Sequence, residues 1–211
     1  MNIGKLQEFT SYLDEKGGGL IPQKWRFVFN KPTGRGTGNP WFDLYDVSSN
    51  DDYKELSLAC TTATIPGRSL STGEVHAPGP EQKYPYQDVF EDLELTFLCT
   101  AGKLEKKQKN IVIGLKERRF MDAWMAQICD PTTMLFNYSD EYATTIELIP
   151  YNSRNNVISA YRFHRVYPLQ IGPIEFTHDA TELATFTVTF NYDRWTYLDP
   201  ILYDPDLDEP T

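Results

Sequence analysis

Bulky and hydroxylated residues alternate most regularly near the end of the chain, over residues 184–192. Every second position from Ala184 to Tyr192 is apolar or aromatic. The positions between them hold Thr185, Thr187, Thr189 and Asn191. Successive side chains of a strand point to opposite sides, so this alternation predicts a β-strand with one buried face and one small, uncharged polar face.

Shorter runs predict further strands at residues 24–30, 41–47, 54–62, 93–98, 143–149 and 157–166. Between residues 64 and 86 the pattern is broken by Pro66-Gly67, Pro78-Gly79-Pro80 and Tyr84-Pro85. Proline cannot donate a ladder hydrogen bond, so this stretch cannot be central sheet throughout. We expect a long loop with one short pairing segment near residues 74–77, and loops of this length are usually functional.

Two segments have the spacing of an amphipathic helix. The stronger covers residues 115–129, where Asp130-Pro131 ends the pattern, and its apolar stripe consists of Met121, Trp124, Met125 and Ile128. This stripe indicates a helix packed on the core rather than a cofactor site. The second lies within residues 2–16, with Leu6, Phe9 and Leu13 on one side.

Strands therefore dominate, and the sequence predicts one α+β domain, mainly β, over residues 1–211. We expect an antiparallel β-sandwich or barrel with one packed α-helix. Three segments flank this body: the N-terminal helix with its glycine linker (1–19), the long loop (64–86) and an acidic C-terminal tail (196–211) without a basic residue.

The formal net charge is −10, which narrows the classes of partner. Affinity for phosphates needs Lys and Arg, so stable binding to nucleic acid or to an anionic membrane is not expected. No apolar run reaches transmembrane length, and residues 1–10 lack the apolar core of a signal peptide. Widely spaced Cys60, Cys99 and Cys129 indicate reduced thiols. We expect a protein made in the cytoplasm that stays soluble until it assembles.

Few residues of the chain are candidates for catalysis or metal binding. His76, His164 and His178 are the only histidines, none stands in a metal-binding spacing, and no Gly-x-Ser-x-Gly motif occurs. The sequence therefore predicts no metal, no cofactor and no enzymatic activity. An active site assembled from distant residues stays an open alternative.

The hydroxylated face of residues 185–191 has two interpretations. It is either an ordinary solvent-exposed sheet face, or the lining of a closed surface formed by a sheet that continues between subunits. Exposed faces usually carry Lys and Glu, which also block pairing between sheet edges, and this face carries neither.

The order of several segments resembles the tail tube proteins of contractile-tailed phages, which are similar to the tube proteins of type VI secretion and related injection systems. The resemblance covers about residues 20–195. The segments that carry it are ATIPGR (63–68), DLELTF (92–97), RFMDAW (119–124), VYPLQIGPI (166–174) and ATFTVTFNYDRW (184–195). The chain is longer than a typical tube subunit, and its acidic tail extends past Trp195.

This resemblance implies a hexameric ring in which strands of each copy join one inner β-barrel, and rings that stack into a tube in the phage tail. It implies further copies of the chain, a sheath protein, a baseplate tube initiator and a tape-measure protein as partners, with DNA passing through unbound. The candidate lumen lining is Thr185, Thr187, Thr189 and Asn191. The candidate intersubunit loop contains Pro66, Arg68, Glu74 and His76, and the N-terminal helix and acidic tail are further contact candidates.

Other interpretations stay open at this point. Within the same class, a baseplate tube initiator or a tail terminator would form a single ring. A small-ligand β-barrel would account for the many aromatic residues, and an unrecognised enzyme is the third alternative.

Overall fold

A computed structural model describes residues 22–30, 50–75, 82–104, 112–152, 155–179 and 181–198, together with the single positions Ser11 and Trp41. The N-terminal helix expected at 2–16 and the strand expected at 41–47 lie outside the described residues, apart from those two positions. The tail from residue 199 also lies outside them. The chain divides into two compact units, one of residues 1–26, 148–161 and 197–211 and one of residues 27–147 and 162–196.

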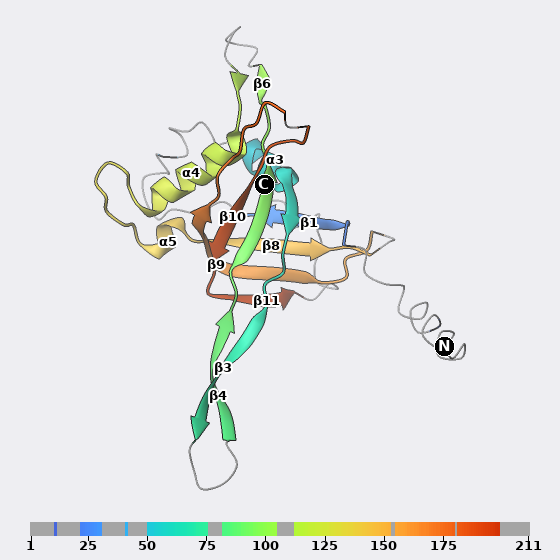
Figure 1. Ribbon diagram of the computed structural model, residues 1–211, viewed down its shortest axis with the longest axis vertical. Coiled ribbons are helices and arrows are strands. Elements are labelled where there is room, and N and C mark those ends of the chain that lie inside the picture. Colours follow the sequence, from blue (N-terminus) through green and yellow to red (C-terminus); the bar gives the residue numbers. More distant parts are fainter. Residues whose placement is uncertain are drawn as a thin grey trace. The chain divides into compact units, whose positions relative to one another are not determined.

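A seven-stranded sheet is the main element, and its strands are shown as arrows in Figure 1. Its order is β1 (Trp25–Phe29), β8 (Thr144–Pro150), β9 (Ala160–Ile171), β10 (Thr185–Asn191), β5 (Leu93–Leu98) and β2 (Cys60–Ala63), and β11 (Arg194–Leu198) also pairs with β9. The strands predicted at 24–30, 93–98, 143–149 and 184–192 are confirmed. The strand predicted at 157–166 begins at Ala160 and continues to Ile171.

The mainly β character is confirmed, but the described strands leave this sheet open, with β1 and β2 at its ends. A barrel closed within one chain is therefore not formed by them. Two further antiparallel pairs are separate from the sheet: β3 (Arg68–Val75) with β4 (Gln82–Phe90), and β6 (Lys103–Leu104) with β7 (Val112–Ile113).

Three helices are described: α3 (Asn50–Ala59), α4 (Lys116–Ile128) and α5 (Ser139–Tyr142). The helix predicted at 115–129 is confirmed as α4. The strand predicted at 54–62 was wrong, because α3 occupies most of it and only Cys60–Ala63 is extended. Leu56 is buried and Leu58 is 86 % exposed, which is the result of helical rather than alternating geometry at these positions.

The core of the larger unit is aromatic. The ring of Trp124 on α4 lies 5.0 Å from that of Phe29 on β1 and 5.7 Å from that of Phe190 on β10, so one indole joins a helix to two strands. Met121 is fully buried as well, whereas Met125 and Ile128 are half-buried. Phe120, which the predicted stripe left out, is buried and faces Phe29 at 5.2 Å.

The smaller unit contains residues of β1, β8, β9 and β11. Tyr151 donates a backbone hydrogen bond to the carbonyl of Lys24 (2.9 Å), whose Nζ donates to Asn155 Oδ1 (2.8 Å). The rings of Tyr161 and Tyr197 lie 5.1 Å apart. Leu148, Ile149 and Ala160 are its buried apolar residues among those described.

The stretch 64–86, expected to be a long loop, contributes most of the β3–β4 hairpin. Pairing extends over eight register positions from Arg68↔Phe90 to Val75↔Gln82, with a shift between Ser71 and Thr72 next to Pro85. Both strands of a two-stranded sheet are edges, and an edge tolerates a proline that a central strand would not. The expectation that this stretch is no central strand was right, and the expectation of a single short pairing segment was wrong.

Candidate assembly surfaces

The four polar residues of β10 share one side of the sheet with residues of β5, and we call this surface the threonine face. In the antiparallel register Thr185 lies opposite Leu98, Thr187 opposite Thr96 and Thr189 opposite Glu94. Thr185 and Thr187 are exposed, and Thr189 and Asn191 are half-buried. The hydroxyls of Thr187 and Thr96 lie 3.1 Å apart, so a hydrogen bond crosses the two strands.

The charges on the threonine face are acidic. Glu94 is exposed on β5, and Asp92 accepts a long hydrogen bond from Asn191 Nδ2 (3.5 Å). On the other side of β10, the uncharged Gln170 of β9 lies opposite Thr189. The surface over β5, β10 and the adjoining end of β9 is thus a neutral to acidic one, and polyanions would gain no attraction from it.

Large apolar side chains on the opposite side of β10 hold the threonine face in place. Phe186, Val188 and Phe190 are buried on the opposite side of β10, as the alternation predicts. The Phe186 ring lies 5.7 Å from that of Phe97 on β5. Because β10 is paired with β5 from Thr185 to Phe190 and with β9 from Val188 to Asn191, and packs on a dense core, its polar residues project from a rigid surface.

The β3–β4 hairpin contains two of the four residues predicted for an intersubunit loop. Pro66 precedes β3 and is buried, Arg68 and Glu74 lie on β3, and His76 lies outside the described residues. Arg68 Nη2 contacts Asp88 Oδ2 at 2.5 Å, and this hydrogen bond is the main cause that lowers the pKa of Asp88. At the far end, Lys83 Nζ lies 3.5 Å from Glu74 Oε1. Ion pairs across the strands therefore reinforce the hairpin at both ends.

Sequence reasoning missed the exposed apolar residues of this hairpin. Tyr84 and Tyr86 on β4 are 50 % and 64 % exposed, and Leu70 on β3 is 58 % exposed. The alternation of Tyr84, Tyr86 and Asp88 was visible in the sequence, but the neighbouring prolines obscured it. Exposed aromatic residues on a two-stranded ribbon are typical of interaction surfaces.

Of the two histidines in the described part of the chain, His164 is the one with a hydrogen-bonding side-chain neighbour. Its Nε2 lies 2.9 Å from Thr196 Oγ1, and burial, followed by the nearby Arg194 and Arg162, lowers its pKa. Arg162 is itself bound to the buried Glu147 at 2.6 Å. These contacts are explained by packing of β9 against its neighbours. Within the described part of the chain, no group of His, Cys, Asp and Glu could hold a metal ion.

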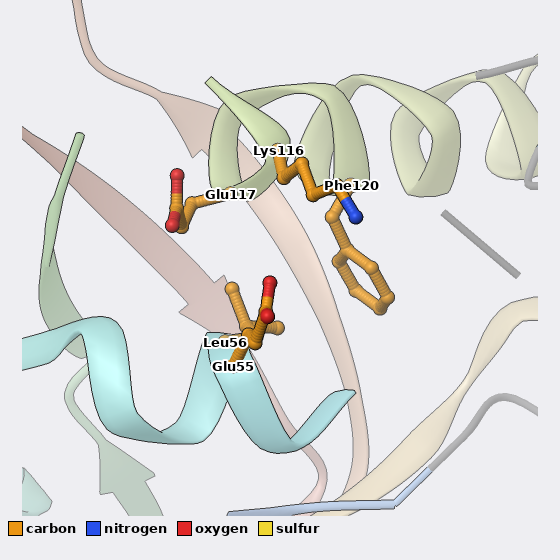
Figure 2. Close-up of a pocket in the computed structure, with 5 residues that line it drawn as sticks. All are labelled: Glu55, Leu56, Lys116, Glu117 and Phe120. Carbon is orange, nitrogen blue, oxygen red and sulfur yellow. The ribbon is translucent and has the colours of Figure 1, made fainter. Parts of the chain in front are cut away.

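The cavity between α3 and α4 is small. Figure 2 shows Glu55 and Leu56 of α3 on one side and Lys116, Glu117 and Phe120 of α4 on the other. Its volume is about 10 Å³, which is room for at most one water molecule. Glu117 accepts hydrogen bonds from the hydroxyl (2.8 Å) and the backbone N–H (3.2 Å) of Thr100, so its carboxylate fixes the turn after β5. Among the described helices, none is long and apolar enough to cross a membrane.

The described chain thus combines an open, mainly antiparallel sheet, a neutral to acidic polar face, a packed helix and an exposed hairpin. The family model described as phage tail tube protein matches residues 26–198, and the chain belongs to this family. No curated protein sequence matches the chain.

Solved structures share the fold. A protein in the structure of the sheath/tube terminator of an extracellular contractile injection system superimposes with a TM-score of 0.54 and 11 % identity, covering 86 % of this chain and 97 % of the other. A protein of the baseplate of the anti-feeding prophage has a TM-score of 0.53 and 9 % identity, covering 87 % and 98 %. At such identities the likeness establishes the fold alone.

Proposed function

We propose that this chain is a non-enzymatic structural subunit of the inner tube of a contractile phage tail. Six copies form a ring, and rings stack into a channel through which DNA passes without being held. The observation that carries the proposal is the rigid threonine face of β10, in a chain whose residues 26–198 match the tail tube family.

The open sheet supports ring formation. Its last strands on either side, β1 and β2, are edges within the described chain. Exposed edges invite pairing with other chains, and a sheet continued around a ring has no free edge. In such a ring the threonine face lines the lumen, and Thr185, Thr187, Thr189 and Asn191 are the lining residues of each copy.

The β3–β4 hairpin is suited to contacts between rings. Leu70, Tyr84 and Tyr86 expose apolar surface that a neighbouring copy would cover. Stacking of rings head to tail is a heterologous contact, which produces a filament. The expected partners are further copies of this chain, a sheath protein, a baseplate tube initiator and a tape-measure protein. The protein would be made in the host cytoplasm and reside in the virion.

A second candidate is a ring at one end of the tube, either an initiator at the baseplate or a terminator. The two solved structures described above come from a sheath/tube terminator and from a baseplate. Such a protein would form a single ring and would not polymerise.

Electron microscopy of the purified full-length chain separates these possibilities. We expect hollow tubes built of stacked six-fold rings, each surrounding a central channel. Isolated six-fold rings that do not stack would favour the end protein. A protein that stays monomeric at every concentration would contradict both proposals.

A further inference from the structure

Strand β9 belongs to two halves of the large sheet, because its neighbours change along its length. β10 pairs with residues 167–171, and β11 continues β10 along the first half of β9. Where the two meet, the backbone N–H of Asp193 donates to the carbonyl of His164 (3.1 Å). We call β2, β5, β10 and residues 167–171 of β9 the threonine half, since the threonine face lies on it. The other half consists of β1, β8, the first half of β9 and β11.

The threonine half has two open edges within the described part of the chain. One is β2, at the end of the sheet order. The other is the side of residues 167–171 that faces away from β10. Pro150 of β8 accepts the N–H of Ile158 just before β9 (3.1 Å). Counted along the antiparallel ladder from there, β8 ends with Thr144 opposite about residue 164, so β8 does not reach this side.

Backbone groups on both open edges point away from the sheet. One row of residues crosses the four strands, and it consists of Ala63, Leu95, Val188 and Ile171. On β2 the next residue, Thr64, donates its N–H inward to a carbonyl of β5 (3.2 Å), so the N–H and C=O of Ala63 point outward. On β9 the next residue, Gly172, donates inward to a carbonyl of β10 (2.7 Å), so those of Ile171 point outward. Each end of the row offers a donor and an acceptor to a further strand.

The open edges of the threonine half carry no charge, unlike the edges of the other half. β2 is Cys-Thr-Thr-Ala, and residues 167–171 are Tyr-Pro-Leu-Gln-Ile. In the other half, the edge strand β1 carries the exposed Arg26 and the edge strand β11 the exposed Arg194. Charged side chains on an edge hinder pairing with another chain, so the other half is protected and the threonine half is not. Pro168 is tolerated at an edge, and it leaves the N–H of Ile171 available.

We propose that β2 of one copy pairs with residues 167–171 of β9 in the next copy and continues the sheet antiparallel. The four strands of the threonine half alternate in direction, so β2 and β9 run opposite ways. Rotation about a ring axis keeps every strand's direction along that axis, and the two edges of neighbouring copies therefore meet antiparallel. Because the edges differ, the contact is heterologous and closes a ring by repetition. This inference rests on the proposed tube function and assigns the joint between copies within a ring.

A second copy is the occupant that matches both sides of these edges. Thr64 and Gln170 are exposed on the same side of the sheet as the threonine face. Antiparallel pairing of Ala63 with Ile171 sets Thr64 opposite Gln170, so the uncharged polar face continues across the joint. On the core side the half-buried side chains of Ala63 and Ile171 then lie beside each other.

Directed disulfide formation tests the joint. Thr64→Cys and Gln170→Cys are combined in the full-length chain, which is oxidised mildly under assembly conditions and separated by non-reducing electrophoresis. Within one copy, three strand spacings separate β2 from β9, about 14 Å in all, whereas a disulfide joins Cα atoms at most about 7 Å apart. We therefore expect covalent oligomers up to a closed ring of six and no bond within a copy. The chain with only Cys60, Cys99 and Cys129 gives the background.

Two matched pairs of cysteines control the assignment. Thr62→Cys with Gln170→Cys shifts the register by two residues and should give less product, and more product from this pair would support the same joint in the shifted register. Arg26→Cys with Arg194→Cys places thiols on the edges of the other half and should give only the background. Oligomers from this last pair, with none from either pair on the threonine half, would overturn the proposal.

A proline variant tests the pairing without oxidation. Ala63→Pro removes an N–H that points outward and that pairing within one copy does not use. We expect a folded chain by circular dichroism and melting curves, with self-association at least tenfold weaker by analytical ultracentrifugation. Ala63→Ser keeps the N–H and should associate like the native chain. Native association of a folded Ala63→Pro chain would contradict the joint, and if this variant does not fold, the disulfide experiment decides.

The outcomes also separate this inference from the proposed function. Hollow tubes of six-fold rings in which neither cysteine pair of the threonine half crosslinks would refute the joint and leave the tube proposal standing. Crosslinked copies that form open chains without a channel in micrographs would support the joint and refute the tube.

Discussion

At the scale of single residues, Tyr192 shows how the threonine face is anchored. Its hydroxyl donates to the carbonyl of Glu91 (2.7 Å), and its ring lies 5.2 Å from that of Phe163. Burial, followed by the nearby Asp92 and Glu91, raises the pKa of Tyr192 to about 12 from an ordinary 10.0. This phenol closes β10 and joins it to the turn before β5, so it links the two strands that carry the polar face.

The raised pKa predicts alkaline destabilisation. Above pH 10 the unfolded chain loses the Tyr192 proton while the folded chain keeps it until about pH 12, so stability falls across this window. Tyr192→Phe removes that contribution and one hydrogen bond, which costs about 1 kcal/mol at pH 8. We expect the difference in unfolding free energy between native chain and variant to shrink from pH 10 to 12, measured by urea denaturation.

A control keeps the effect of ionisation apart from that of destabilisation. Leu95→Val removes one buried methylene and no ionisable group, and it should cost about 1 kcal/mol at every pH. Its pH profile should run parallel to that of the native chain. If Tyr192→Phe also runs parallel, the buried phenol makes no contribution to the alkaline transition.

At the scale of elements, α4 is the part that joins two connecting segments to the core. Its middle packs on β1 and β10 through Trp124, whose Nε1 also donates to the carbonyl of Tyr142 (2.8 Å). Its first turn is bound to the connector after β9 through Arg118 and the carbonyl of Gly172, and its last turn is bound to Asn137 in the segment before α5. Loss of the packing of this helix would displace both segments together.

We predict that Trp124→Ala destabilises the chain by about 3–5 kcal/mol, because it leaves a large cavity between helix and sheet and an unpaired carbonyl at Tyr142. Met125→Ala is the matched control on the same helix. Met125 is half-buried, and its truncation should cost about 1 kcal/mol or less. Chemical denaturation measures both. Equal losses for the two variants would contradict the placement of Trp124 at the centre of the core.

Elements whose apolar residues follow a single spacing, either that of a strand or that of a helix, were predictable from the sequence. In β10 each apolar residue from Phe186 to Phe190 is buried, because β5 holds the strand in register over this whole range and β9 adds pairing from Val188 onwards. In α3 two periods coincide at Leu56: alternation with Leu58 suggests a strand, whereas spacing from Tyr53 suggests a helix. Tertiary burial of Tyr53 and Leu56 selects the helix, and local sequence does not reveal that choice.

The assembly surfaces were only partly predictable for a different reason. The threonine face follows from alternation within one strand. The point where β9 and β10 separate, at Val188, depends on the register between distant segments. Residues 131–138 read in sequence like a stretch that ends a helix, and their conformation depends on hydrogen bonds that Asp130 accepts and Asn137 donates. Such three-dimensional features leave little periodic signal.

At the scale of the whole molecule, the distribution of charge fits the proposed channel. The chain has net charge −10, and the threonine face carries hydroxyls, amides and acidic groups. DNA passing over such a surface meets no Lys or Arg from these residues, and it is the pairing of phosphates with cations that holds nucleic acid. The threonine hydroxyls supply a strand-forming, hydrated surface without that attraction.

The neutral to acidic lining therefore predicts that cations introduced on the threonine face slow the passage of DNA. Thr187→Lys with Thr189→Lys would place two cations per copy on the threonine face, and a six-fold ring would multiply them. A protein with six to ten phosphate contacts loses about 10³–10⁵ in affinity between 50 and 200 mM salt, so DNA retention by the variant should be strong at low salt and vanish at high salt. Filter binding of DNA to assembled rings or tubes measures retention, and the rate of DNA ejection from particles measures passage.

Thr187→Glu with Thr189→Glu is the matched control, since it adds side chains of similar bulk and the opposite charge. If electrostatic attraction governs passage, only the lysine variant slows ejection, and added salt restores the native rate. Equal slowing by both variants would assign the effect to bulk in the channel. Ejection at the native rate with lysines on an intact ring would place the threonine face outside the path of DNA, because no polyanion could pass twelve or so unscreened cations unaffected at low salt.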